Sequence, residues 1–149
     1  MGKMDNKVAI VTGGGKGIGF GIATAFAKEG ANLVITGRTI ERLQSAKEKL
    51  EAYGVTVLPV AADGGDEAQV KEAVRQTIEK FGKIDVLVNN AQVSKSGVLL
   101  KDHTKEDFDL AIYSGLYAAF FYMRECFPYL KQSRGSVINF ASGAGLFGK

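Results

Sequence analysis

The sequence has few of the residues that build disulfide bonds, metal sites and membrane segments. Its 149 residues include one cysteine, one histidine, two prolines and no tryptophan. Cys126 has no second cysteine to pair with, and His103 lacks the spaced cysteine or carboxylate partners of a metal site. No apolar run is long enough for a signal peptide or a membrane-spanning helix. These absences predict a cytoplasmic protein that holds no metal and has no membrane partner.

The excess of charge of one sign is also small. The net charge is +3 at pH 7, and the charged residues are spread along the chain. We therefore expect no nucleic-acid-binding surface and no surface for anionic membranes. Glycine, in contrast, is abundant, with 19 residues that gather where apolar runs end. Such clusters indicate tight turns or a backbone that a ligand approaches closely.

Short apolar runs alternate with longer amphipathic segments along the chain. The short runs predict strands at residues 7–12, 31–36, 55–60, 84–88 and 135–141. The segments between them carry apolar residues at helical spacing. This alternation predicts an α/β protein with a doubly wound parallel sheet in three layers and the strand order 3-2-1-4-5. Pro59 indicates either that the third strand lies at an edge of the sheet or that the proline lies at the end of this strand.

We expect each helix to bury one apolar face. The expected faces are Ile18, Ile22, Ala25 and Phe26; Leu43, Ala46, Leu50 and Tyr53; Val70, Val74, Ile78 and Phe81; and Phe108, Ile112, Leu116, Ala119, Met123, Phe127 and Leu130. The last set lies on one long helix over residues 105–131. In that helix Pro128 is expected to kink the final turns, and Cys126 is expected to be buried as a small hydrophobic residue.

The segment TGGGKGIG, from Thr12 to Gly19, lies between the first strand and the first helix. In a doubly wound sheet this junction faces the crevice at the carboxyl ends of the strands. Free N–H groups and the positive end of the helix dipole attract a phosphate there, and glycines let it come close. The spacing is neither that of a P-loop nor G-x-G-x-x-G; it is T-G-x-x-x-G-x-G.

With this pattern the chain resembles the short-chain dehydrogenase/reductase family, whose cofactor turn has the form T-G-x-x-x-G-I-G. Asp63 after the third strand, Asn89 to Ala91 after the fourth and Ser142 after the fifth match further family segments in order. The resemblance implies a Rossmann-type fold, a nicotinamide cofactor and hydride transfer between that cofactor and a carbonyl or alcohol. It predicts a single dinucleotide-binding domain over residues 1–149, incomplete at its C-terminus.

The resemblance assigns cofactor binding to the glycine turn and to segments after the second, third and fourth strands. The residues are Thr12, Gly13, Gly15, Lys16, Gly17, Ile18, Gly19, Arg38, Asp63, Asn90 and Ala91. An acidic residue at the end of the second strand would bind the ribose 2′-hydroxyl, but this chain carries Gly37 and Arg38 there. The guanidinium, with Lys16, favours NADP over NAD. The alternatives are a solvated Arg38 and an Asp63 that only starts the next helix.

The resemblance also implies a catalytic residue. Ser142 matches the family serine that hydrogen-bonds the substrate oxygen, with an ordinary turn serine as the alternative. Two positions depart from the family pattern: Gln92 replaces a glycine, and Gly115 stands where the long helix carries an asparagine. The family's Tyr-x-x-x-Lys pair is absent, because none of the five tyrosines is followed by a lysine four residues later.

The sequence therefore predicts the cofactor-binding portion of an NADP-dependent short-chain oxidoreductase for a small-molecule carbonyl or alcohol. Two other hypotheses stay open: a module that binds NADP(H) or a related nucleotide without catalysis, and an inactive folded fragment. The aromatic run from Phe120 to Tyr122 is broader than one helix face needs. Together with the resemblance, it predicts a homo-oligomer that pairs through the helix at residues 105–131.

Overall fold

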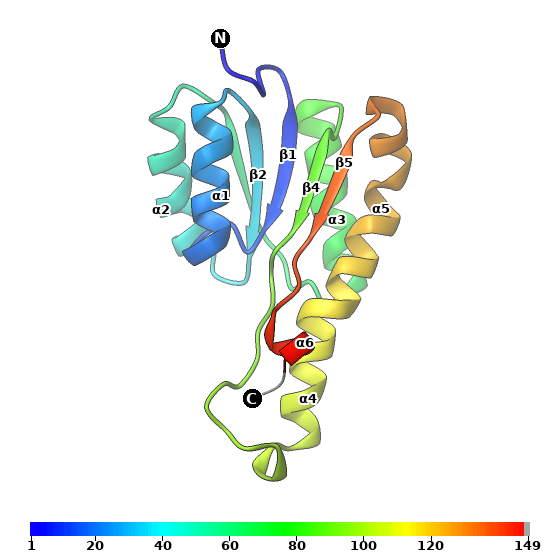
Figure 1. The fold of residues 1–149 in the computed structure, drawn as a ribbon. Coiled ribbons are helices and arrows are strands. Elements are labelled where there is room, and N and C mark those ends of the chain that lie inside the picture. Colours follow the sequence, from blue (N-terminus) through cyan, green and yellow to red (C-terminus); the bar gives the residue numbers. More distant parts are fainter. Residues whose placement is uncertain (148–149) are drawn as a thin grey trace.

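One parallel sheet forms the centre of the computed structural model, which describes residues 1–147 (Figure 1). The strands are β1 (Val8–Thr12), β2 (Asn32–Gly37), β3 (Val57–Ala61), β4 (Val86–Asn89) and β5 (Ser136–Asn139). They lie in the order β3-β2-β1-β4-β5, and each neighbouring pair is parallel. The predicted α/β class and strand order are confirmed, and Pro59 lies on the edge strand β3.

Helices cover both faces of the sheet (Figure 1). On one face lie α1 (Gly17–Lys28) and α2 (Ile40–Glu51), and on the other lie α3 (Glu67–Phe81) and α5 (Ala118–Ser133). The buried side chains accordingly form two clusters, one on each side of the sheet. Ile10 and Val11 are successive residues of β1 and belong to different clusters, because strand side chains alternate between the two faces.

A long helical rod reaches beyond the carboxyl ends of the strands (Figure 1). It consists of α4 (Lys105–Ala111), the π-helical turn η2 (Ile112–Tyr117) and α5, which continues through Pro128. A capping box starts the rod: Thr104 and Asp107 exchange side-chain to backbone bonds, each 3.1 Å long. The remaining short helices are η1 (Leu100–Asp102) and α6 (Ala144–Phe147).

The predicted apolar face of α1 is only partly correct, because Ile22 and Phe26 pack partly buried against the core but are not at its centre. The buried residues are Gly19, Ala23 and Ala27, whereas Ala25 is exposed and Ile18 is 70% exposed. Small residues face the sheet because α1 begins directly beside the end of β1, where the backbones approach closely. The larger side chains Ile22 and Phe26 lie beside this contact and are partly buried.

The predicted face of the long helix is wrong over most of its length, although Leu130 is buried and Met123 packs partly buried against the core. Its buried residues are Ala118, Phe121, Tyr122, Cys126 and Leu130, whereas Phe108, Leu116 and Phe127 are exposed. The π-helical turn holds an extra residue, so helical spacing counted from the start of the rod is out of phase in α5. Cys126 is buried as predicted, and burial raises the pKa of its thiol to about 12.

The other predicted faces match more closely. Leu43, Ala46 and Leu50 of α2 are buried, but Tyr53 lies beyond the end of that helix and is exposed. In α3, Val70 and Val74 are buried, and Ile78 and Phe81 pack partly buried against them. Across residues 1–147, no helix combines the length and apolarity that crossing a membrane requires.

Candidate functional site

A cavity of about 530 Å³ opens at the carboxyl ends of the strands, a size typical of small-molecule sites. Segments that follow β1, β2, β3 and β4 line it together with the helical rod. Ten of the eleven predicted cofactor residues contribute to the lining: Thr12, Gly13, Gly15, Lys16, Gly17, Ile18, Arg38, Asp63, Asn90 and Ala91. The predicted residues Gly19 and Ser142 do not line it.

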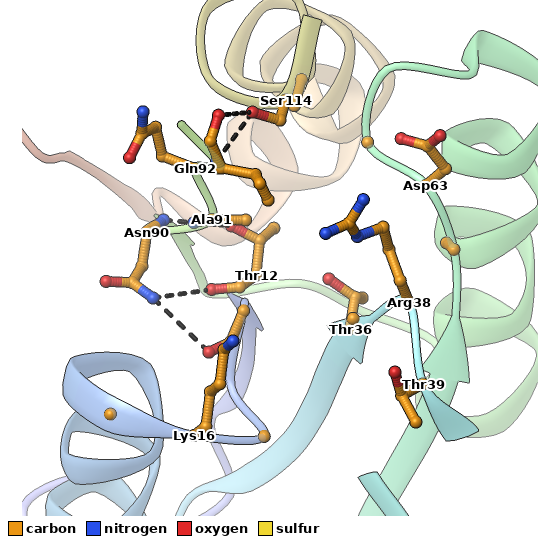
Figure 2. A pocket seen from close by; sticks show the side chains of 18 of the residues that line it. Thr12, Lys16, Thr36, Arg38, Thr39, Asp63, Asn90, Ala91, Gln92 and Ser114 are labelled. Atoms are coloured by element: carbon orange, nitrogen blue, oxygen red, sulfur yellow. Dashed lines mark hydrogen bonds between the residues drawn. The ribbon is translucent and has the colours of Figure 1, made fainter. Parts of the chain in front are cut away.

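Thr12 and Asn90 bind the end of β1 to the end of β4 (Figure 2). The Thr12 hydroxyl accepts the N–H groups of Asn90 and Ala91 at 3.0 Å each and donates to the Val88 carbonyl at 3.3 Å. The Asn90 side-chain amide donates to the carbonyls of Thr12 at 3.2 Å and Gly13 at 3.5 Å. These bonds fix the turn after β1 relative to the segment after β4, so both backbones reach the cavity in one arrangement.

The glycine turn leaves room at the start of α1. Gly13 and Gly17 have φ angles of 65° and 56°, in the left-handed region that glycine adopts without strain. A Cβ on Gly17 would have no atom within 4 Å, so open space lies before the helix. Lys16 precedes this helix and provides no side-chain cap. The free N–H groups of the first turn can therefore bind an anionic ligand.

Gly19 lies behind the turn and serves packing. A Cβ at this position would stand 2.1 Å from the Gly13 carbonyl oxygen and 2.6 Å from the Asn90 amide nitrogen. No side chain fits there without moving the turn. The sequence predicts that Gly19 binds the cofactor, whereas the structure places Gly19 behind the turn and outside the lining of the cavity.

Three cations line the cavity without an acidic partner. None of the ion pairs among residues 1–147 involves Lys16, Arg38 or Arg42. Lys16 comes from the glycine turn and Arg38 from the end of β2 (Figure 2). The sequence analysis missed Arg42, which lies in the first turn of α2, shortly after Arg38. Such unpaired cations suit a phosphate group.

Asp63 is the one carboxylate in the described lining of this cavity. Its Oδ1 accepts the Gly65 N–H at 2.9 Å, and its own N–H donates to Gln69 at 2.8 Å. The cap of α3 is Asp66, whose carboxylate accepts the N–H groups of the first helical turn. Asp63 thus orders the turn before α3 and also lies at the cavity, a position that is compatible with either interpretation.

Tyr122 forms a part of the lining that the sequence did not reveal. Its side chain is 1% exposed, and its hydroxyl has no hydrogen-bond partner within residues 1–147. Burial raises the pKa of this phenol to about 12, so it stays protonated at neutral pH. The Thr36 side chain, which also lines the cavity, lies beside this hydroxyl and opposes part of the pKa rise. In the sequence, Tyr122 reads only as another residue of an apolar helix.

The residues around the cavity fit a dinucleotide. Free N–H groups at the start of α1 and three cations suit phosphates, while Asp63 offers a further polar contact. No three histidine, cysteine or acidic side chains gather as metal ligands in the part of the chain that the structure describes. His103 lies 3.8 Å from Asp107 on the rod, away from the cavity lining.

Ser142 lies apart from this cavity, in an exposed turn before α6. Its hydroxyl accepts the N–H of Ala144 at 3.2 Å, as a turn serine does. The strand that precedes Ser142 is nevertheless bound to the strand beside the cavity. The side-chain amide of Asn89 donates to the Asn139 side chain at 2.8 Å and joins the ends of β4 and β5. Ser142 follows Asn139 by three residues and so leaves the same edge of the sheet.

Comparison with known proteins agrees with this geometry. The family described as short chain dehydrogenase matches residues 7–149. A 12α-hydroxysteroid dehydrogenase from Clostridium sp. is 64% identical over 99% of the chain and 60% of its own length. The hydroxysteroid dehydrogenase-like protein 2 of Mus musculus is 37% identical over 93% of the chain and 30% of its length.

Solved structures resemble the chain in the same way. An NAD⁺-bound xylitol dehydrogenase superimposes with a TM-score of 0.93 at 30% identity, over 99% of this chain and 57% of its own. A levodione reductase gives a TM-score of 0.92 at 31% identity, over 99% and 58%. The chain therefore spans 60% or less of the length of these relatives.

The close contact at Gly19 gives a test of how the site is supported. We expect Gly19→Ala to lower the free energy of unfolding by about 1–3 kcal/mol, the usual cost of overpacking. Gly21→Ala, in the same helix, is the control, because its Cβ would meet no atom within 4 Å. It should raise stability by about 0.5–1 kcal/mol. Urea unfolding measures both, and equal stability of the two variants would contradict the packing role of Gly19.

Proposed function

Because the chain belongs to the short-chain dehydrogenase family, we propose that it is the NADP(H)-binding portion of an oxidoreductase for a carbonyl or alcohol. The observation that carries this proposal is the group of unpaired cations, Lys16, Arg38 and Arg42, at the cavity. The glycine turn and the start of α1 would bind the pyrophosphate. The end of β2 would then face the adenosine ribose, as it does in dinucleotide-binding folds.

The preference for NADP rests on the chemistry at the end of β2. An acidic side chain there would bind a ribose 2′-hydroxyl and repel a 2′-phosphate. This chain has Gly37 at the end of β2, followed by the exposed and unpaired Arg38. A guanidinium binds phosphate through charge-assisted hydrogen bonds, and Lys16 adds a second positive charge from the glycine turn.

The catalytic role that we propose falls to Ser142. When bound, the nicotinamide donates or accepts the hydride. The Ser142 hydroxyl would donate a hydrogen bond to the substrate oxygen from the β5 side of the sheet edge. Tyr122 is not suited to move the proton, because burial raises the pKa of its hydroxyl to about 12 instead of bringing it close to neutrality.

The substrate class that we propose is a secondary alcohol or its ketone, with hydroxysteroids as the first candidates. This choice rests on the relative that is named a 12α-hydroxysteroid dehydrogenase and is 64% identical to the chain.

We expect Arg38→Ala to weaken NADPH binding and leave NADH binding unchanged. Loss of charge-assisted bonds worth about 1.5–3 kcal/mol corresponds to an affinity about 10 to 150 times lower. Fluorescence titration with each cofactor measures the change. Arg75→Ala is the matched control, because it removes the same charge from the outer surface of α3, where Arg75 pairs with Glu72 and Glu79. Stronger binding of NADH than NADPH by the unmodified chain would refute the NADP assignment.

A second test concerns catalysis. NADPH oxidation with a panel of ketones, and NADP⁺ reduction with the matching alcohols, should both depend on Ser142. Removing a hydrogen-bond donor to the reacting oxygen typically lowers kcat by about 100 to 1,000 times, and we expect this for Ser142→Ala. Ser136→Ala, on the exposed strand β5, is the control. Cofactor binding without any turnover would favour a module that binds NADP(H) without catalysis.

A third test concerns self-association through the helical rod. Leu116, Phe120 and Phe127 are exposed at helical spacing. We propose that a second copy of the chain packs on this face, since large exposed apolar faces mark interfaces. Sedimentation equilibrium should show a dimer that Phe120→Asp dissociates. Tyr53→Asp, on another exposed aromatic side chain, should leave the dimer intact. A monomer at every concentration would contradict this interface.

A further inference from the structure

The two positions at which the chain departs from the family pattern lie in contact with each other. A Cβ on Gly115 would stand 3.2 Å from Cγ of Gln92 and 3.8 Å from its Cβ. The stem of the Gln92 side chain thus lies tightly against the position of that Cβ and would have to shift by a few tenths of an ångström to admit it. The added side chain after β4 and the missing side chain on the rod are two parts of one local arrangement.

The segment that carries Gln92 is held firmly against the rod. The Ser114 hydroxyl accepts the Val93 N–H at 2.8 Å and donates to the Val93 carbonyl at 3.0 Å (Figure 2). Ser114 and Gly115 both belong to the π-helical turn η2, a kind of turn that is often found at functional sites. The N–H and the carbonyl of Val93, the residue after Gln92, are therefore both held by hydrogen bonds. The position of the Gln92 backbone relative to the rod is fixed as a result.

The carboxamide of Gln92 is free to bind a ligand. Gln92 lines the cavity, and none of the side-chain hydrogen bonds within residues 1–147 involves it. In Figure 2 its side chain extends away from Arg38 and Asp63. The amide offers both a donor and an acceptor to the end of the cavity that lies opposite these charged residues.

The strand order shows which half of a dinucleotide would reach this end. Arg38 follows β2 and the glycine turn follows β1, while Gln92 follows β4, on the other side of β1. A ligand with its 2′-phosphate at Arg38 and its pyrophosphate at the glycine turn must extend its other half past β1 towards β4 and β5. Asn89 pairs in register with Asn139, and Gln92 and Ser142 each follow their strand by three residues.

We propose that Gln92 is a specificity-determining residue whose carboxamide hydrogen-bonds the nicotinamide riboside half of the cofactor, and that Gly115 provides the space it needs. This inference rests on the proposed function, because it takes the orientation of NADP(H) from Arg38 and the glycine turn. Gly115 has no positive φ, so its backbone accepts an alanine. An alanine methyl would nevertheless press on the Gln92 stem and move the amide.

The test compares two ligands that differ only in the nicotinamide riboside. We expect Gln92→Ala to weaken the binding of NADPH about two- to tenfold, the range for one neutral hydrogen bond, and to leave the binding of 2′-phosphoadenosine 5′-diphosphate within about twofold. Gly115→Ala should weaken the binding of NADPH to a similar extent. It should also raise the urea concentration at the midpoint of unfolding, because alanine favours a helix more than glycine does. The double variant should bind NADPH no more weakly than the single variants, since each of the two substitutions removes the same contact.

The controls separate this inference from the proposed function. Gln44→Ala, exposed on α2, and Gly21→Ala, with open space around its Cβ, should leave the affinity for both ligands unchanged. Equal weakening of both ligands by Gln92→Ala, or no weakening of either, would overturn the role of Gln92 while NADP binding stands. An unmodified chain that binds neither ligand would overturn both proposals.

Discussion

The site depends on one close backbone contact, in which Gly19 of α1 lies against the carbonyl of Gly13 at the end of β1. The space that a Cβ on Gly19 would occupy is already filled by that carbonyl oxygen and by the Asn90 amide. This contact sets the distance between helix and strand, and therefore the place where the first turn of α1 begins. The hydrogen bonds from Asn90 and Ala91 to the Thr12 hydroxyl hold the segment after β4, on the other side of the cavity, next to the end of β1. The N–H groups of the glycine turn reach the cavity because both contacts are present.

The strands could be predicted from the sequence because each is a short apolar run with a turn at its end, and parallel order follows from the helices between them. Two helix faces could not. Ile18 looks like a core residue, yet it is exposed at the cavity, where a ligand rather than the core would cover it. In the long rod, apolar residues lie on two faces, and the π-helical turn shifts their phase by a residue. Helical spacing in a single sequence reveals neither a ligand nor an inserted residue.

The same limit applies to individual site residues. The glycine turn, Arg38 and Asp63 were predictable because each follows a strand and carries a residue type with one plain chemical use. Tyr122 was not predictable, because its hydroxyl acquires meaning only from its burial beneath the cavity without a partner. Gly19 was found for its spacing, but only the structure shows that it supports the turn and does not face a ligand.

The charges around the cavity are arranged unevenly, and this asymmetry has a consequence for any dinucleotide that binds. Lys16, Arg38 and Arg42 lie towards β2 and α2, while the end beyond β1 presents the neutral Gln92 and Ser114. The phosphate-rich half of a ligand is attracted to the first end, so the neutral half is directed to the second. At that end the polar amide is that of Gln92. It lies on the segment after β4, which Ser114 holds by two hydrogen bonds, and not on the helical rod. A polar group on a short fixed segment can approach a ligand from a different angle than one on the rod.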